Sequence, residues 1–170
     1  MTPRHPADWL ALSLLPGLGP ISLTRLLERF EDPAEIAFRV PAGTLSLACR
    51  GANAGKIRSA RLGLRRKVDR EIARARQAGA RIVPRDAPGY PAALLEIPDP
   101  PILLYVRGEL PQDRVRVALV GSRAATRYGR EFAHGIAAEL ARAGVEIVSG
   151  GARGIDSAAH RGALDEGGPT

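Results

Sequence analysis

Residues 115–156 read VRVALVGSRAATRYGREFAHGIAAELARAGVEIVSGGARGID, and this stretch decides the fold class. The apolar run at 115–120 predicts a strand, and residues 129–143 have the spacing of an amphipathic helix. A second apolar run, at 145–148, precedes another glycine-rich turn and a helix expected over 155–166. Strand, loop, helix, strand, loop and helix in this order are typical of a doubly wound α/β sheet with parallel strands.

Both turns carry residues that suit an anionic ligand. In a doubly wound sheet the ligand lies beyond the carboxyl ends of the strands, where glycine-rich loops meet the amino termini of helices. The two loops supply glycines for close approach, hydroxyl donors and guanidinium groups that can fork onto a phosphate. The candidate residues are Gly121, Ser122, Arg123, Ser149, Gly150 and Arg153. Neither loop has the spacing of a dinucleotide fingerprint or of a phosphate loop, so each alone indicates generic phosphate affinity or simply a tight turn.

The first part of the chain is predicted to be a small helical domain. Asp8 and Pro20 are signals for the start of a helix. The turn between the first two helices contains Gly17 and Gly19, which let the chain reverse and expose amide groups at a helix start. This is typical of a helix-hairpin-helix or SAM-like domain, and it makes both glycines candidates for phosphate binding. Helices are expected over residues 9–15, 21–30, 33–38 and 42–48.

The basic charge of the chain is concentrated in one segment. The net charge is +7, and residues 50–85 hold twelve Arg or Lys against two acidic residues, so the rest of the chain is slightly acidic. After a glycine-rich turn at 51–55, one helix is expected over 56–78, with apolar residues on one face and arginines over the others. A localised basic stripe indicates a polyanionic partner, and a merely solvated surface helix gives the same pattern. Arg61 and Arg65 are the candidate contacts to such a partner in this segment.

The pattern changes after Gly79 from helical spacing to short apolar runs bounded by proline or glycine. Strands are predicted over 80–84 and 102–106, with a short helix around 92–95 between them. We therefore place the domain boundary between residues 79 and 80. The predicted fold class is α/β, with a helical domain over 1–79 followed by a Rossmann-like doubly wound domain over 80–170.

Composition excludes several classes of protein. The longest apolar runs are far shorter than the ~20 residues that cross a bilayer, and the amino terminus has no secretory signal, so a cytoplasmic protein without a membrane partner is expected. The single cysteine, Cys49, cannot form an internal disulfide or a metal cluster, and no cofactor is expected. Asp156 and His160 lie four residues apart on one helix face, and we interpret them as structural because no nucleophile accompanies them. The protein is therefore not expected to be an enzyme.

The two loops become specific when they are considered with their flanks. The segments VGSR at 120–123 and VSGGARGID at 148–156, with the Thr and the Tyr-Gly pair at 126–129, closely resemble the DprA/Smf family of DNA-processing proteins. The proline-rich lead-in at 90–108 and the turn LPGLGP at 15–20 resemble the same family. The resemblance covers nearly the whole chain, in the family's order.

This resemblance implies a non-enzymatic protein that binds single-stranded DNA entering a bacterium during natural transformation and delivers it to the RecA recombinase. In the family the arginine of the Gly-Ser-Arg motif contacts the DNA backbone in a basic pocket, and Arg123 holds that position here. The other loop candidates fall in the pocket loops by motif match. Thr126 and Tyr128 are further candidates, Tyr128 for stacking on a base. Gly151 replaces the leucine that is common in the family's second loop.

The resemblance also implies that the Rossmann-like domain is incomplete at its carboxyl end. The sequence stops at Thr170, where the family enters a third core strand. The family forms a homodimer, and its dimer and RecA-binding surfaces lie in the portion that follows, so neither is expected in this chain. We also expect one uncovered sheet face and weaker protection of the α/β region than of the helices.

Two other hypotheses stay open at this point. The first is a Rossmann-like nucleotide-binding or nucleotide-cleaving enzyme, which would need a further glycine-rich loop with a catalytic acid; the sequence shows no such loop. The second is a helix-hairpin-helix module whose α/β part is only a scaffold. Substituting the arginines of each domain separately would discriminate between them.

Overall fold

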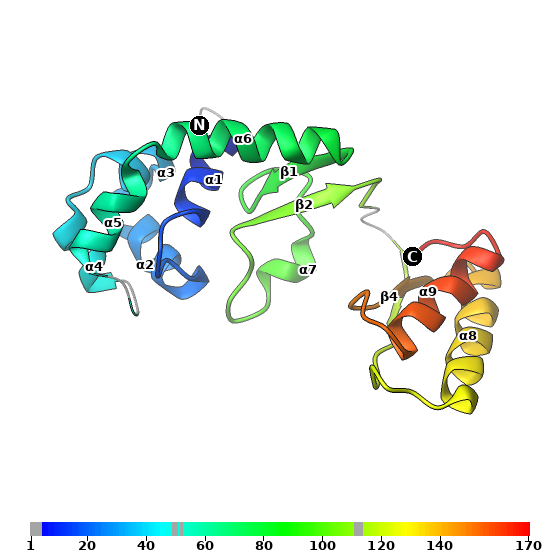
Figure 1. The fold of residues 1–170 in the computed structure, drawn as a ribbon. Helices are drawn as coiled ribbons and strands as arrows, with labels where there is room; N and C mark the ends of the chain where they lie inside the picture. Colours follow the sequence, from blue (N-terminus) through cyan, green and yellow to red (C-terminus); the bar gives the residue numbers. More distant parts are fainter. Residues whose placement is uncertain (1–4, 49–50, 52, 111–113) are drawn as a thin grey trace. The chain divides into compact units, whose positions relative to one another are not determined.

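The computed structural model describes residues 5–48, 51, 53–110 and 114–170. The chain separates into two compact units, Met1–Leu110 and Pro111–Thr170, which are described here one at a time (Figure 1). Cys49, and Ala52 of the turn expected at 51–55, lie outside the described residues. The mixture of helices and small sheets confirms the predicted α/β class.

The first unit begins with four short helices. Three of them have proline in the first turn, where its missing N–H costs no hydrogen bond. The first helix starts earlier than predicted, because His5 and not Asp8 is its cap: His5 Nδ1 accepts a hydrogen bond from the amide of Ala7 at 3.3 Å. The helices are α1 (Pro6–Ser13), α2 (Pro20–Phe30), α3 (Pro33–Phe38) and α4 (Ala42–Ala48).

The prediction of one continuous basic helix is wrong. The structure has two helices, α5 (Ala54–Arg61) and α6 (Leu64–Gln77), separated by Leu62 and Gly63. Gly63 adopts φ 70°, a left-handed conformation that an L residue disfavours and that ends the helical path. The apolar spacing continues across this break, so periodicity alone did not reveal it.

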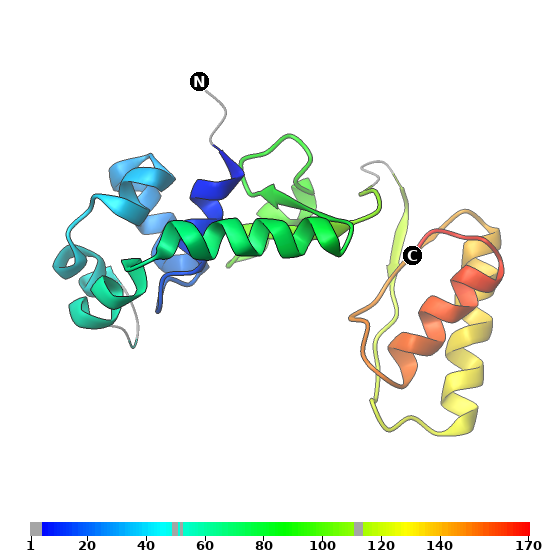
Figure 2. The same cartoon turned by 45° about the horizontal axis from the view of Figure 1, so that its top comes forward.

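Two strands complete the first unit. β1 (Ala80–Pro84) pairs antiparallel with β2 (Leu103–Arg107), and α7 (Ala92–Leu95) lies in the connection. Figure 2 shows α6 running alongside this pair. Ile82, Ile102 and Leu103 pack into the core of the helices. The first compact unit therefore extends to Leu110, past the boundary expected between residues 79 and 80, because one face of the strand pair packs against the helices.

The second unit is a β-α-β-α arrangement. β3 (Arg116–Ala118) and β4 (Glu146–Val148) are parallel, and Val117 pairs with Ile147. α8 (Arg127–Arg142) and α9 (Ile155–Asp165) both cover one face of this pair (Figure 2). The other face exposes Val120 and Val148, at 73% and 44% of their surface. Among the described residues of this unit, no helix packs against that face.

The two helices of this unit approach each other closely because the contact is made by small residues. Ala137, Ala141, Ala159 and Ala163 are buried between them and Ile147. A Cβ on Gly162 would lie 2.2 Å from the carbonyl oxygen of His134, a distance that no real contact allows. Only glycine fits there, and the close approach fixes which faces of α8 and α9 lie side by side.

Among the described residues, no helix combines the length and the apolar character needed to cross a membrane.

Candidate nucleic-acid interface

The two predicted loops are in contact at the carboxyl end of the parallel strands. The amide of Ile155 donates to the carbonyl oxygen of Ser122 at 3.2 Å. Gly154 adopts φ 90°, and a Cβ there would lie 2.2 Å from the same oxygen and 2.9 Å from the carbonyl oxygen of Arg123. Glycine at 154 is therefore required both by its backbone conformation and by the approach of the first loop. Gly121 in turn packs against the side chain of Ile155.

The first loop presents its polar groups to solvent. Gly121, Ser122 and Arg123 are all exposed. Ser122 Oγ accepts a hydrogen bond from the amide of Ala124 at 3.1 Å, which leaves its hydroxyl hydrogen free to donate. Thr126 Oγ1 accepts from the amide of Gly129 at 3.1 Å and so caps α8. Within the described residues Arg123 forms no ion pair, so its guanidinium is available for a ligand.

Polar side chains in and next to the second loop fix its conformation through hydrogen bonds. Ser149 Oγ donates to the carbonyl oxygen of Leu119 at 2.6 Å, and this bond ties the end of β4 to the chain that leaves β3. Asp156 is 6% exposed, and its Oδ2 accepts from the amide of Ala152 at 3.3 Å. These two residues thus shape the loop, while Gly150 and Arg153 remain exposed.

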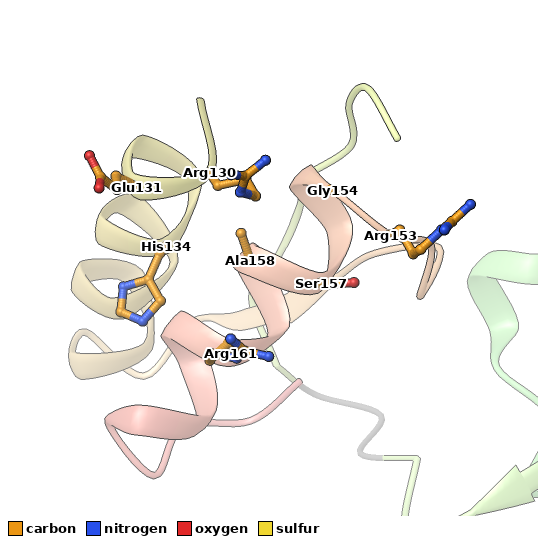
Figure 3. Close-up of a pocket in the computed structure, with 8 residues that line it drawn as sticks. All are labelled: Arg130, Glu131, His134, Arg153, Gly154, Ser157, Ala158 and Arg161. Carbon is orange, nitrogen blue, oxygen red and sulfur yellow. The ribbon is translucent and has the colours of Figure 1, made fainter. Parts of the chain in front are cut away.

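A pocket of about 580 Å³ opens between α8 and α9 beside the second loop. Figure 3 shows that Arg130 and His134 come from α8, Arg161 from α9, and Arg153 from the loop before α9, with the Arg153 side chain pointing away from α8. We call it the arginine pocket. Its complete lining is Arg130, Glu131, His134, Arg153, Gly154, Ser157, Ala158 and Arg161.

The arginine pocket is strongly cationic. Glu131 is its one acidic residue, and its carboxylate is engaged by Arg127 at 2.7 Å. His134 Nε2 lies 2.7 Å from Asp165 Oδ2, a contact that holds the imidazole at the wall of the pocket. Arg130 donates to the carbonyl oxygen of Ala125 and thereby joins the pocket to the first loop. Three guanidinium groups around a solvent-filled hollow suit a ligand with several negative charges.

Sequence reasoning placed Arg153 in this site but missed Arg130, His134 and Arg161. One signal was available, because Ser157 and Arg161 are four residues apart and share one face of α9, which begins two residues after Arg153. No sequence signal brings Arg130 and His134 to that face. They arrive there through the packing of α8 on α9 at Gly162.

An exposed aromatic pair lies on the first turns of α8. Tyr128 and Phe132 stack with their ring centroids 6.0 Å apart and their planes at 21°. They are 75% and 57% exposed, respectively. The sequence singled out Tyr128 alone; Phe132 follows it by four residues and doubles the flat apolar surface beside the first loop.

The candidates in the first unit have mostly structural surroundings. Gly17 adopts φ 75° in the turn, and the carbonyl oxygen of Gly19 accepts from the amide of Leu23 as α2 begins. Arg61 donates to two backbone carbonyl oxygens of α3, at 2.8 and 2.9 Å, and burial lowers the pKa of its guanidinium. The Arg65 guanidinium lies over the ring of Phe38, 4.6 Å from its centroid.

The side chains of Asp156 and His160 have separate hydrogen-bond partners. Asp156 binds the second loop, whereas His160 Nδ1 lies 2.5 Å from Thr170 Oγ1. Within the described part of the chain, no three His, Cys, Asp or Glu side chains gather closely enough to hold a metal ion.

Residues 81–170 match the family model for DNA recombination-mediator protein A. The chain belongs to this family. The resemblance to DprA/Smf proteins drawn from the sequence is thereby confirmed. Protein Smf of Synechocystis is 33% identical over the whole of this chain and 44% of its own length. The putative DNA processing protein DprA of Mycobacterium tuberculosis is 34% identical over 89% of this chain and 41% of its own.

The fold is shared with a solved DprA/Smf-family structure. The X-ray structure of DNA processing protein A from Streptococcus pneumoniae superimposes with a TM-score of 0.67 and 26% identity, over 96% of this chain and 55% of that one. The chain spans less than half the length of the two curated relatives named above. What the whole protein does is therefore a matter for proposal.

Proposed function

We propose that the second unit binds single-stranded DNA, with the sugar-phosphate backbone along the two loops and the arginine pocket. One observation carries this proposal: three arginines from two helices and a loop surround one open hollow, with Arg123 exposed on the adjoining loop. Guanidinium groups fork onto phosphate oxygens, and such contacts position a strand without reading its sequence. The names of the relatives, which are DNA processing proteins, support the same ligand class.

A strand fits this surface better than a free mononucleotide does. The cations are spread over the first loop, the second loop, α8 and α9, so a chain of phosphates can engage more of them than a single nucleotide can. The exposed Tyr128–Phe132 pair offers a flat apolar face, on which an unpaired base can stack. Bases inside a duplex are already stacked on each other, so this face favours single-stranded over double-stranded DNA.

The proposal for the whole protein goes further than this unit. It is that the protein is not an enzyme, acts in the cytoplasm, protects incoming DNA and delivers it to the RecA recombinase in natural transformation. A labelled oligonucleotide should therefore be recovered at full length after incubation with the protein.

The test measures the affinity of the 170-residue chain for a labelled poly-dT oligomer at one fixed salt concentration. Arg123→Ala, and separately Arg161→Ala, should each weaken binding by about 1–3 kcal/mol, with little dependence on base sequence. Arg114→Ala removes an exposed arginine of the same unit outside both loops and the pocket, and should have a smaller effect. Folded variants at positions 123 and 161 that bind as tightly as the wild type would remove the proposal, as would equal affinity for a duplex of the same length.

A further inference from the structure

The basic segment of the first unit divides into two sets of cations in the folded chain. One set has intramolecular partners. Arg61 binds carbonyl oxygens of α3, Arg65 lies over Phe38, and Arg74 pairs with Glu71 at 2.7 Å. These three arginines stabilise the helical unit, and their presence in the sequence needs no ligand.

The other set lines a shallow pocket at the break between α5 and α6. Arg66, Lys67 and Arg70 are exposed there, and within the described residues they form no ion pair. The Arg70 side chain donates from Nε to the backbone carbonyl oxygen of Arg66, at 3.3 Å. We call this the hinge pocket. Its volume is about 580 Å³, and its lining is Leu62, Gly63, Arg66, Lys67, Asp69 and Arg70.

The three exposed cations do not stabilise α6. α6 buries Leu64, Val68 and Ala75, and the three exposed cations contribute no packing to that face. Arg66 and Arg70 are one turn apart, a spacing at which like charges repel and destabilise an isolated helix. Asp69 supplies a single negative charge against three positive ones. An anionic ligand would remove the repulsion, which is a physical reason for the cluster to exist.

An exposed apolar side chain lies at the edge of the same pocket. Leu62 is 77% exposed and occupies the break that Gly63 creates between the helices. A ligand that combines closely spaced anions with apolar or aromatic groups would contact both the cations and this leucine. A nucleic-acid strand has that combination, since phosphates alternate with sugars and bases.

We propose that the hinge pocket is a second phosphate-binding site for a nucleic-acid strand, located on the helical unit and separate from the arginine pocket. Arg66 and Arg70 are about 6 Å apart along the helix axis, at 1.5 Å per residue, a spacing comparable to that of successive phosphates on one strand. Lys67 adds a third charge beside them, and Leu62 contacts a sugar or base. The ligand class is that of the proposed function, but no residue is shared between the two sites.

The experiment uses salt to count phosphate contacts in the full chain. The slope of log K against log salt for a poly-dT oligomer shrinks by about 0.7 for each contact removed from a single strand. Combined substitution of Arg66→Gln, Lys67→Gln and Arg70→Gln should therefore reduce the slope by about 2. The charge-matched control combines Arg25→Gln, Arg29→Gln and Arg39→Gln, three exposed positions of the same unit outside the hinge pocket. It should change the slope by less than half as much.

Each other outcome overturns the proposal. An unchanged slope in the folded hinge variant would mean that these three side chains are solvated and do not contact the DNA. Equal changes in both variants would mean that only net charge matters. Poly-glutamate could also compete for the wild-type chain as effectively as poly-dT does. If this competition disappeared only in the hinge variant, the pocket would be a site for an acidic protein.

The same measurement separates this proposal from the one for the second unit. If the hinge variant loses slope while the Arg123→Ala and Arg161→Ala variants both bind normally, the hinge site is supported and the proposed function is wrong. If the hinge variant keeps its slope while the variants at 123 and 161 bind more weakly, only the proposal of the hinge site is wrong. A wild-type chain that fails to bind poly-dT at low salt overturns both.

Discussion

The two units of this chain are stabilised by opposite kinds of side chain. The core of the first unit is built from large residues, such as Trp9, Leu10, Leu12, Leu23 and Ile36, which are almost completely buried. The core of the second unit consists of four alanines and Ile147, with glycines where backbones approach each other. The first unit therefore depends on apolar area removed from water, and the second on close contact between backbones.

This difference bears on the binding site proposed for the second unit. α8 and α9 bury few large side chains, and arginines lie on their exposed faces. Val120 and Val148 are exposed on the other face of the sheet. A small core also tolerates substitutions less well, because a single added methyl group alters the packing of a large part of it. Removing side-chain atoms should therefore destabilise the first unit most, and adding side-chain atoms should destabilise the second unit most.

The largest effect is expected from truncating a core residue of the first unit. Leu12 is completely buried, and Leu12→Ala should destabilise this unit by about 2–5 kcal/mol through lost burial and a residual cavity. Hydrogen exchange followed by mass spectrometry would report faster exchange in α1 and α3, with α8 and α9 unchanged. Leu47→Ala is the matched control, because Leu47 is 90% exposed and its truncation leaves no cavity. Equal effects of the two substitutions would contradict the description of this core.

The second unit should respond most strongly to an added atom. Gly162→Ala places a Cβ against the backbone of His134 and should cost about 1–3 kcal/mol, as overpacking does. Exchange should then accelerate in α8 and α9 while the first unit keeps its protection. Gly135→Ala tests the same chemical change in α8 at a place where a Cβ meets nothing within 4 Å. That control should be neutral or stabilising by about 0.5–1 kcal/mol, because alanine favours helix over glycine. A Gly162→Ala variant as stable as the control would show that the helices can separate without cost.

Local signals predicted most of the elements, whereas the candidate site depended on packing. Prolines at helix starts and apolar runs located α2, α3, α4 and the four strands closely, because these features act within a few residues of the chain. The break at Gly63 was missed, since the apolar spacing on either side continued in phase. The arginine pocket was missed in part for a different reason. Arg130 and Arg161 are far apart in the chain, and only the contact of α8 with α9 places them around one hollow.

The smallest expected effect concerns an ion pair that joins the ends of α8 and α9. Arg142 donates to both carboxylate oxygens of Glu166, at 2.8 and 3.0 Å, and this hydrogen bonding lowers the pKa of Glu166 below its ordinary value of 4.5. A carboxyl group whose pKa falls on folding contributes stability above its unfolded pKa, and that contribution is lost as the pH falls through the folded value. The pair is solvent-exposed, so its contribution is small and is screened by salt.

Thermal unfolding of the wild type and of Glu166→Gln should therefore differ slightly at pH 7 and low salt, and the difference should vanish as the pH is lowered past 4.5 toward 3 or as salt is raised. Glu131→Gln removes the same charge from the same unit, but its partner Arg127 lies on the same helix, so it does not join α8 to α9. Only the Glu166 variant should also accelerate hydrogen exchange at the carboxyl end of α9. A stability difference that persists unchanged at pH 3 would mean that Glu166 acts through packing and not through its charge, and the second unit would then depend on its small-residue contacts alone.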